Sequence, residues 1–199
     1  MPARAVPPLV ATFADLPDPR RGQGRRHPLP AILALSCAAM LAGCDSLLAI
    51  AEWGRDPAGG APLGARLGFT RAKTPCVATL HRVFRRIDVA AFERAVGGWA
   101  AAVAAAAGRG EPPVGVAVDG KLLRGSAAAG VPAVHLLAAL RQDLGLVLAQ
   151  VRVPAGRGEA AAVPELLAGL VVDGAVLTMD AGVGSREVAE AVLAKGGTT

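Results

Sequence analysis

The sequence predicts two halves of different fold class: an all-helical N-terminal half and a C-terminal α/β half with a mixed sheet. Between residues 77 and 87, apolar side chains recur at steps of three and four, the period of an α-helix. After a Gly/Pro-rich break at 108–113, the chain changes to short β-branched runs typical of strands. Two of these runs finish on an aspartate, which is costly to bury and therefore marks a candidate functional position.

Residues 1–28 are rich in Pro and Arg and show no apolar period, so we expect a basic arm or loop there. Its arginines are candidate contacts for phosphate, and a solvated basic stretch without such a role is the alternative. These arginines are Arg20, Arg21, Arg25 and Arg26.

Residues 29–53 predict a helical run, which Asp45-Ser46 is expected to interrupt or to cap anew. Asp88 is expected to be the N-cap of a further helix over residues 89–107. The apolar run at 31–44 is shorter than the ~18–20 residues that span a membrane. We therefore expect a core helix and no membrane segment, with a small membrane-anchored protein as the alternative.

The C-terminal half predicts the order β-β-β-α-β-α. Three antiparallel strands followed by a right-handed crossover can place the fourth strand beside the first. The expected strands cover residues 114–120, 133–140, 146–154 and 174–181, and the expected helices cover 160–170 and 185–197, the last with Ser185 as N-cap.

Asp119 and Asp180 close the first and fourth strands. Neighbouring strands lie ~4.8 Å apart, so these carboxylates can share one divalent ion, and carboxylates are ligands that Mg²⁺ accepts. Gly120 would let the backbone turn, and Lys121 and Arg124 would then face phosphates. The alternative is an Asp-Gly pair that serves only as an ordinary turn signal.

The composition agrees with an anionic partner, because the net charge is +5 and the sequence pI is about 9.9. The three cysteines form no CxxC pair, so neither a disulfide framework nor a zinc site is expected. No signal peptide is predicted, and we expect a cytoplasmic protein.

Beyond these patterns, an ordered set of motifs marks a family. They are VAVDGKLLRGS, VHLLAAL, LGLVLAQVRV, EAAAVPELLAGL, GAVLTMDA and EVAEAVLAKGG. The set resembles the H-repeat-associated (ISAs-type) insertion-sequence transposases, from about Phe13 to Gly197. The resemblance implies a helical associated domain at 29–108 and an RNase H-like catalytic domain at 113–199. It also implies an Asp-Asp-Glu triad that uses Mg²⁺ (or Mn²⁺) to cut and join double-stranded DNA at transposon ends.

By this resemblance Asp119 and Asp180 are the first two acidic residues of the triad. Lys121, Arg124 and Gly125 match a DGKxxRG motif. Glu159 matches an acidic family position, either as an additional carboxylate or, more simply, as a helix N-terminal charge that the helix dipole favours.

The chain also departs from the family pattern. No residue matches the third acidic member, and the fifth strand is expected to be missing, which would leave the fourth strand exposed along one edge. AGVGSRE follows Asp180 where the family has a different small polar segment.

These features predict a truncated insertion-sequence transposase that is inactive or weakly active. One alternative is a non-catalytic DNA-binding fragment, in which arginines of the helical half hold the DNA. Another is a metal-dependent nuclease of related fold that completes its site with Glu159. A homodimer is left open.

Overall fold

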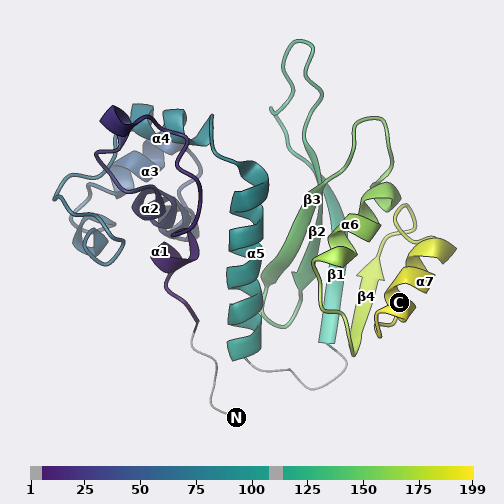
Figure 1. Cartoon of the computed structure of the whole chain (residues 1–199). Coiled ribbons are helices and arrows are strands. Elements are labelled where there is room, and N and C mark those ends of the chain that lie inside the picture. Colours follow the sequence, from purple (N-terminus) through teal and green to yellow (C-terminus); the bar gives the residue numbers. More distant parts are fainter. Residues whose placement is uncertain (1–5, 108–113) are drawn as a thin grey trace. The chain divides into compact units, whose positions relative to one another are not determined.

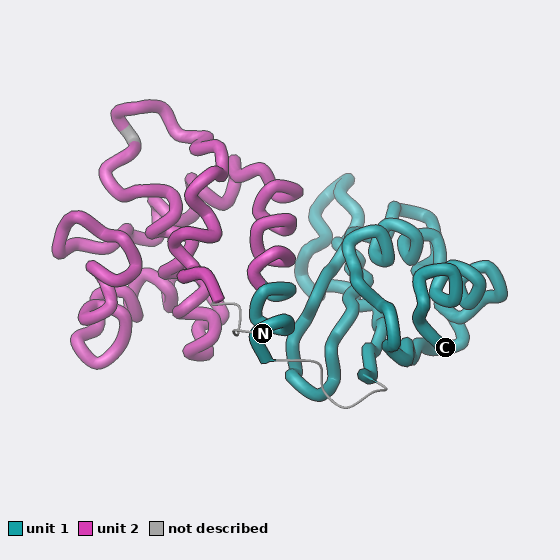
Figure 2. The backbone as a smooth tube through the Cα atoms, turned by 60° about the horizontal axis from the view of Figure 1, so that its bottom comes forward, with its two compact units in different colours: residues 1–5, 100–199 teal, residues 6–99 magenta. Residues whose placement is uncertain are grey.

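A computed structural model describes residues 6–107 and 114–199. The described chain divides into two compact units, one covering residues 6–99 and the other starting at residue 100 (Figure 2). A buried apolar cluster lies within each unit, and no residue belongs to both clusters.

The first unit is helical, as predicted. Ser46 accepts a hydrogen bond from the Ala49 N–H at 3.1 Å, and Asp88 accepts one from Ala91 at 3.0 Å, which confirms both predicted helix starts. The helices are α1 (Leu9–Thr12), α2 (Leu29–Leu41), α3 (Leu47–Trp53), α4 (Val77–Phe84) and α5 (Val89–Ala106), with the 3-10 turns η1 (Gly22–Gly24) and η2 (Ala61–Leu63) (Figure 1).

Helix α2 lies at the centre of the first unit's core, because most of its residues from Leu29 to Ser36 are buried. Its placement confirms that the apolar run at 31–44 forms a core helix. Among the described helices, α5 is the one long and apolar enough to cross a membrane, judged by length and composition alone, and a single such helix is weak evidence for a membrane segment. The sequence analysis predicted this helix but considered only the apolar run at 31–44 as a possible membrane segment.

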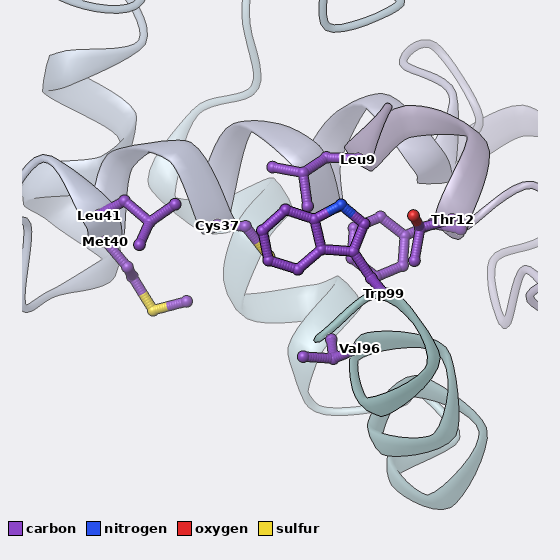
Figure 3. A pocket seen from close by; sticks show the side chains of 8 residues that line it. Leu9, Thr12, Cys37, Met40, Leu41, Val96 and Trp99 are labelled. Carbon is purple, nitrogen blue, oxygen red and sulfur yellow. The ribbon is translucent and has the colours of Figure 1, made fainter. Parts of the chain in front are cut away.

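An apolar pocket of about 270 Å³ opens beside α2 in the first unit. The Trp99 side chain lies across it, near Leu9 and Val96 (Figure 3). The indole Nε1 of Trp99 donates a hydrogen bond to the Pro7 carbonyl at 3.0 Å, which ties the N-terminal segment to α5.

The N-terminal segment is more ordered than a solvated arm. Phe13 is fully buried, and its ring stacks on Phe92 with centroids 5.5 Å apart. The Arg20 side chain is only 7% exposed and is bound by Asp18 and by the His27 carbonyl. Arg20 is therefore bound within the fold and little exposed, whereas Arg21, Arg25 and Arg26 are exposed.

The second unit holds a mixed four-stranded sheet in the order β3-β2-β1-β4. β1 pairs with β2 in antiparallel fashion and with β4 in parallel, so the prediction that the fourth strand lies beside the first is confirmed. The elements are β1 (Val114–Leu122), β2 (His135–Arg141), β3 (Leu146–Arg152), η3 (Glu159–Ala162), α6 (Val163–Ala168), β4 (Ala175–Met179) and α7 (Arg186–Ala194).

One face of this sheet carries the core. Side chains alternate along a strand, and the buried members of β1 and β4 point to the face on which α6 and α7 pack. They include Val116, Val118, Ala175 and Leu177. The opposite face is half-buried or exposed, and we refer to it as the open face.

The outer edge of β4 has a neighbour, which corrects one expectation. Thr198 forms a parallel bridge with Val176: its N–H donates to the Ala175 carbonyl at 2.8 Å and its carbonyl accepts from Leu177 at 2.7 Å. β4 is therefore not bare along its whole outer side, because the last residues begin a fifth line of pairing.

A second correction concerns Gly120. β1 does not turn there but continues to Leu122, with Gly120 paired opposite Leu137. Its φ is not among the positive values, so no turn requires the glycine. The hairpin loop begins later, where Leu123 donates to the Val134 carbonyl at 2.8 Å.

Candidate functional site

The structure brings Asp119 and Asp180 to the same end of two adjacent strands. Val118 and Met179 are register partners in the parallel β1–β4 pair, and the two aspartates are the next residues along each strand. Adjacent strands lie ~4.8 Å apart, so the two backbones are within reach of one shared ion. Both aspartates are exposed.

The alternation of the strands places both carboxylates on the open face. Asp119 follows buried Val118, and Asp180 follows Met179, which packs against the core. The Asp119 side chain therefore points away from α6 and α7, and Asp180, directly after β4, is likewise exposed.

The Asp180 carboxylate is held by its own loop. Its Oδ1 accepts hydrogen bonds from the N–H groups of Gly182 at 2.9 Å and Val183 at 3.0 Å. Both donors belong to the AGVG segment at residues 181–184, which we noted above as a departure from the family pattern. This segment therefore orients the Asp180 carboxylate. No contact within the described residues engages the Asp180 Oδ2 or either carboxyl oxygen of Asp119.

Cationic side chains lie one row further along the open face. Lys121 is two residues beyond Asp119 on β1 and shares its face. Register pairs run from Lys121 to Leu136 and from Leu136 to Arg152, so Arg152 lies in the same row across the sheet. The sequence analysis did not single out Arg152. The alternation of apolar and polar residues in 146–154 indicates that this side chain is exposed, but its place in the same row as Lys121 depends on how the strands pair.

Arg124 lies beyond β1 in the exposed turn that opens the hairpin loop. The base of this loop is fastened by Ser126, whose hydroxyl donates to the Leu123 carbonyl at 2.6 Å and accepts from the Val134 N–H at 2.8 Å. Arg21, Arg25 and Arg26 belong to the other unit.

Glu159 lies on the core side of the sheet. It starts η3, as a helix N-terminal charge would, and its Oε1 is 2.7 Å from the His135 Nε2. A Cβ built on Gly120 would overlap the Glu159 carboxylate, so Glu159 sits over the face of β1 opposite to Asp119. The structure does not bring Glu159 together with the two aspartates, and no cluster of three or more His, Cys, Asp or Glu suited to a metal is found within the described residues.

Two family models and several curated relatives match the chain. The family model "Transposase DDE domain" matches residues 110–199, and the model "DDE_Tnp_1-associated" matches residues 10–100. The chain is 32% identical to "Putative transposase YncI" of Escherichia coli K12, over 96% of this chain and 75% of the relative. The chain belongs to the DDE-type transposase family.

The chain spans only part of other curated relatives that it matches. The chain is 35% identical to the "Uncharacterized protein in dhlA 3'region" of Xanthobacter autotrophicus, over 98% of this chain and 65% of that protein. It is 27% identical to the "H repeat-associated putative transposase YhhI" of Escherichia coli K12, of which it spans 49%. No solved structure matches the chain.

Proposed function

We propose that the chain carries the DNA-binding and part of the catalytic apparatus of an insertion-sequence transposase with an RNase H-like catalytic fold. In this proposal Asp119 and Asp180 are two of its three catalytic acids, and together they bind Mg²⁺ or Mn²⁺. The observation that carries the proposal is the parallel β1–β4 register, which sets the two aspartates side by side at one end of the sheet.

The residues present fit such an ion. Both side chains are exposed carboxylates, the hard oxygen ligands that Mg²⁺ accepts, and Asp180 is already oriented by two backbone N–H groups. A divalent ion bound there would supply an activated water or hydroxyl and stabilise the leaving oxygen of a phosphodiester.

The cations of the open face would bind the DNA backbone. Lys121 and Arg152 lie in one row next to the aspartates, and Arg124 follows in the adjoining turn. Charge-assisted hydrogen bonds to phosphate oxygens would hold the strand across the sheet with its phosphodiester near the carboxylates.

Residues 1–199 alone should be inactive or only weakly active. Glu159 could have served as a third acid, but it binds His135 on the opposite face of the sheet. With two acids, the ion lacks part of its coordination, and cleavage should fall by orders of magnitude. The same position of Glu159 makes a nuclease that completes its site with this residue the less favoured alternative.

Metal binding tests the proposal. The 199-residue protein is titrated with Mn²⁺, and the free ion is measured by electron paramagnetic resonance. The titration should show one binding site, and this site should be lost in Asp119→Asn and in Asp180→Asn. Glu165→Gln, which changes an exposed carboxylate of α6, is the matched control and should bind as the unmodified protein does. Equal Mn²⁺ binding by all four proteins would refute the shared site.

A second assay concerns cleavage. Incubation with Mn²⁺ and DNA containing transposon ends should give little or no nicking. Efficient, specific nicking by this chain would contradict the proposed need for a third acid.

A second candidate function is a DNA-binding fragment without catalysis. The net charge of +5 and the exposed arginines of the helical unit favour it. Salt-dependent DNA binding that is unchanged by Asp119→Asn and Asp180→Asn, together with no Mn²⁺ site, would select this function.

A further inference from the structure

On the core side of the sheet, a hydrogen bond joins the start of β2 to the start of η3. His135 Nε2 and Glu159 Oε1 are 2.7 Å apart, and the two side chains are 29% and 24% exposed. The residues come from segments separated by the whole of β3, so the bond connects the sheet to the crossover that leads to β4.

The same carboxylate packs on the backbone of β1. A Cβ at Gly120 would overlap both oxygens and the carboxyl carbon of Glu159, so a glycine at this position is needed for the carboxylate to lie where it does. Gly120 directly follows Asp119. The Glu159 side chain therefore contacts β1 one residue from the proposed metal ligand, on the reverse side of the strand.

This part of β1 has less support than the rest of the strand. Its pairing with β4 ends at Val118 and Met179, while its pairing with β2 continues to Leu122. Val118 is also the last buried residue of β1, and Leu122 is 56% exposed. From Asp119 onward, β1 therefore has a strand on one side and little of the apolar core beneath it.

We propose that His135 and Glu159 form a positioning pair that fixes the Asp119 end of β1 from the reverse side of the sheet. His135 holds the Glu159 carboxylate in place, and Glu159 packs on Gly120, so β1 stays in register with β2 and Asp119 stays beside Asp180. Because the pair lies on the opposite face, neither residue touches the reacting atoms. This inference rests on the proposed function of Asp119 and Asp180 as metal ligands.

The pair is tested in the full 199-residue protein with three substitutions. Glu159→Ala removes both the hydrogen bond and the packing over Gly120. Glu159→Gln keeps the shape of the side chain and can still hydrogen-bond His135, so this variant should behave as the unmodified protein does. Glu165→Ala removes an exposed carboxylate of the neighbouring helix α6 and is the control.

Hydrogen–deuterium exchange measures how well the backbone amides of β1 are protected, and this measurement needs no metal. The amides of residues 119–122 should exchange faster in Glu159→Ala, and at the unmodified rate in Glu159→Gln and Glu165→Ala. Mn²⁺ affinity, measured by electron paramagnetic resonance, should fall about tenfold in Glu159→Ala alone, as is typical when support for a metal ligand is removed.

A double substitution at Gly120 and Glu159 tests their contact independently. Gly120→Ala should lower stability because the new methyl group meets the Glu159 carboxylate, and this loss should shrink when Glu159→Ala is also present. Should Glu159→Ala fail to fold, His135→Leu removes the hydrogen-bonding ring without emptying the space over Gly120 and should show the faster exchange.

The outcomes separate the two proposals. If the unmodified protein and Asp119→Asn bind Mn²⁺ equally, the metal site is wrong, while the exchange data still decide whether the pair holds β1. Unchanged exchange at 119–122 in both Glu159→Ala and His135→Leu would overturn the positioning pair, as would unchanged Mn²⁺ affinity in Glu159→Ala when the metal site itself is present.

Discussion

Arg20 and Asp18 form a two-pronged ion pair in which Nε and Nη2 donate to the two carboxylate oxygens at 2.9 and 2.8 Å. The Arg20 Nη2 also donates to the His27 carbonyl at 2.8 Å. This network closes residues 18–27 into a compact loop. An arginine that looks like part of a DNA-binding run is thereby committed to the fold.

Asp18→Asn should destabilise the protein by about 2 kcal/mol at pH 7, since it leaves a buried guanidinium without its charged partner. Burial raises the pKa of Asp18, but the hydrogen bonds and charge of Arg20, together with the charge of Arg25, outweigh it and lower this pKa below its usual value. The stabilisation is therefore present above the ordinary Asp pKa and is lost as the pH falls through the folded-state pKa.

Urea unfolding measures this effect at pH 7 and pH 3. The difference between Asp18→Asn and the unmodified protein should shrink at pH 3. Asp15→Asn, at an exposed aspartate in the same segment, should have little effect at either pH. A loss that is equal at the two pH values would argue against the ion pair.

Asp88→Ala should cost about 1 kcal/mol, because the Asp88 side chain caps the first turn of α5 through the Ala91 N–H. Asp88→Ser, which can accept the same hydrogen bond, should retain most of the stability. Thermal unfolding followed by circular dichroism measures both, and equal losses in the two variants would exclude a capping role.

The thiols of Cys37 and Cys76 should react with iodoacetamide at different rates. Burial raises the pKa of Cys37 to about 11, whereas a hydrogen bond with the Thr79 hydroxyl lowers the pKa of the exposed Cys76 thiol. Since the thiolate is the nucleophile, Cys76 should be modified first at pH 8, as measured by peptide mass spectrometry. Thr79→Val should slow Cys76, and faster modification of Cys37 would contradict its burial.

Lys121→Gln and Arg152→Gln should each weaken DNA binding to a similar extent for any DNA sequence. Each should also reduce the slope of log affinity against log salt by about 1, as expected for the loss of one phosphate contact. Fluorescence anisotropy across a salt series measures this slope. Arg186→Gln on α7, whose side chain pairs with Glu190, is the control; a slope change there but not at Arg152 would contradict DNA binding on the open face.

Local sequence patterns were enough for features that depend on near neighbours. The caps at Ser46, Asp88 and Ser185 were all predicted, because an N-cap needs only a short polar side chain before a helix. The position of β4 beside β1 was also predicted, since the handedness of the crossover leaves few alternatives.

Features that depend on strand register could not be predicted. The role of Gly120 follows from a side chain of η3, and the position of Arg152 follows from two successive strand pairings. A register shift at Ala139/Leu140 likewise accounts for Val147 being 46% exposed, although it is two residues from Ala149, which packs against the core.

The bridge between Thr198 and Val176 gives the outer edge of the sheet a direction. Thr198 runs parallel to β4, so a polypeptide attached after Thr199 and continuing this pairing would travel toward the end of β4 where Asp180 lies. An affinity tag placed at the C-terminus would be guided into the neighbourhood of the two carboxylates, and a polyhistidine tag there would add metal ligands of its own. Metal-binding measurements on this protein therefore call for a tag at the N-terminus, or for none.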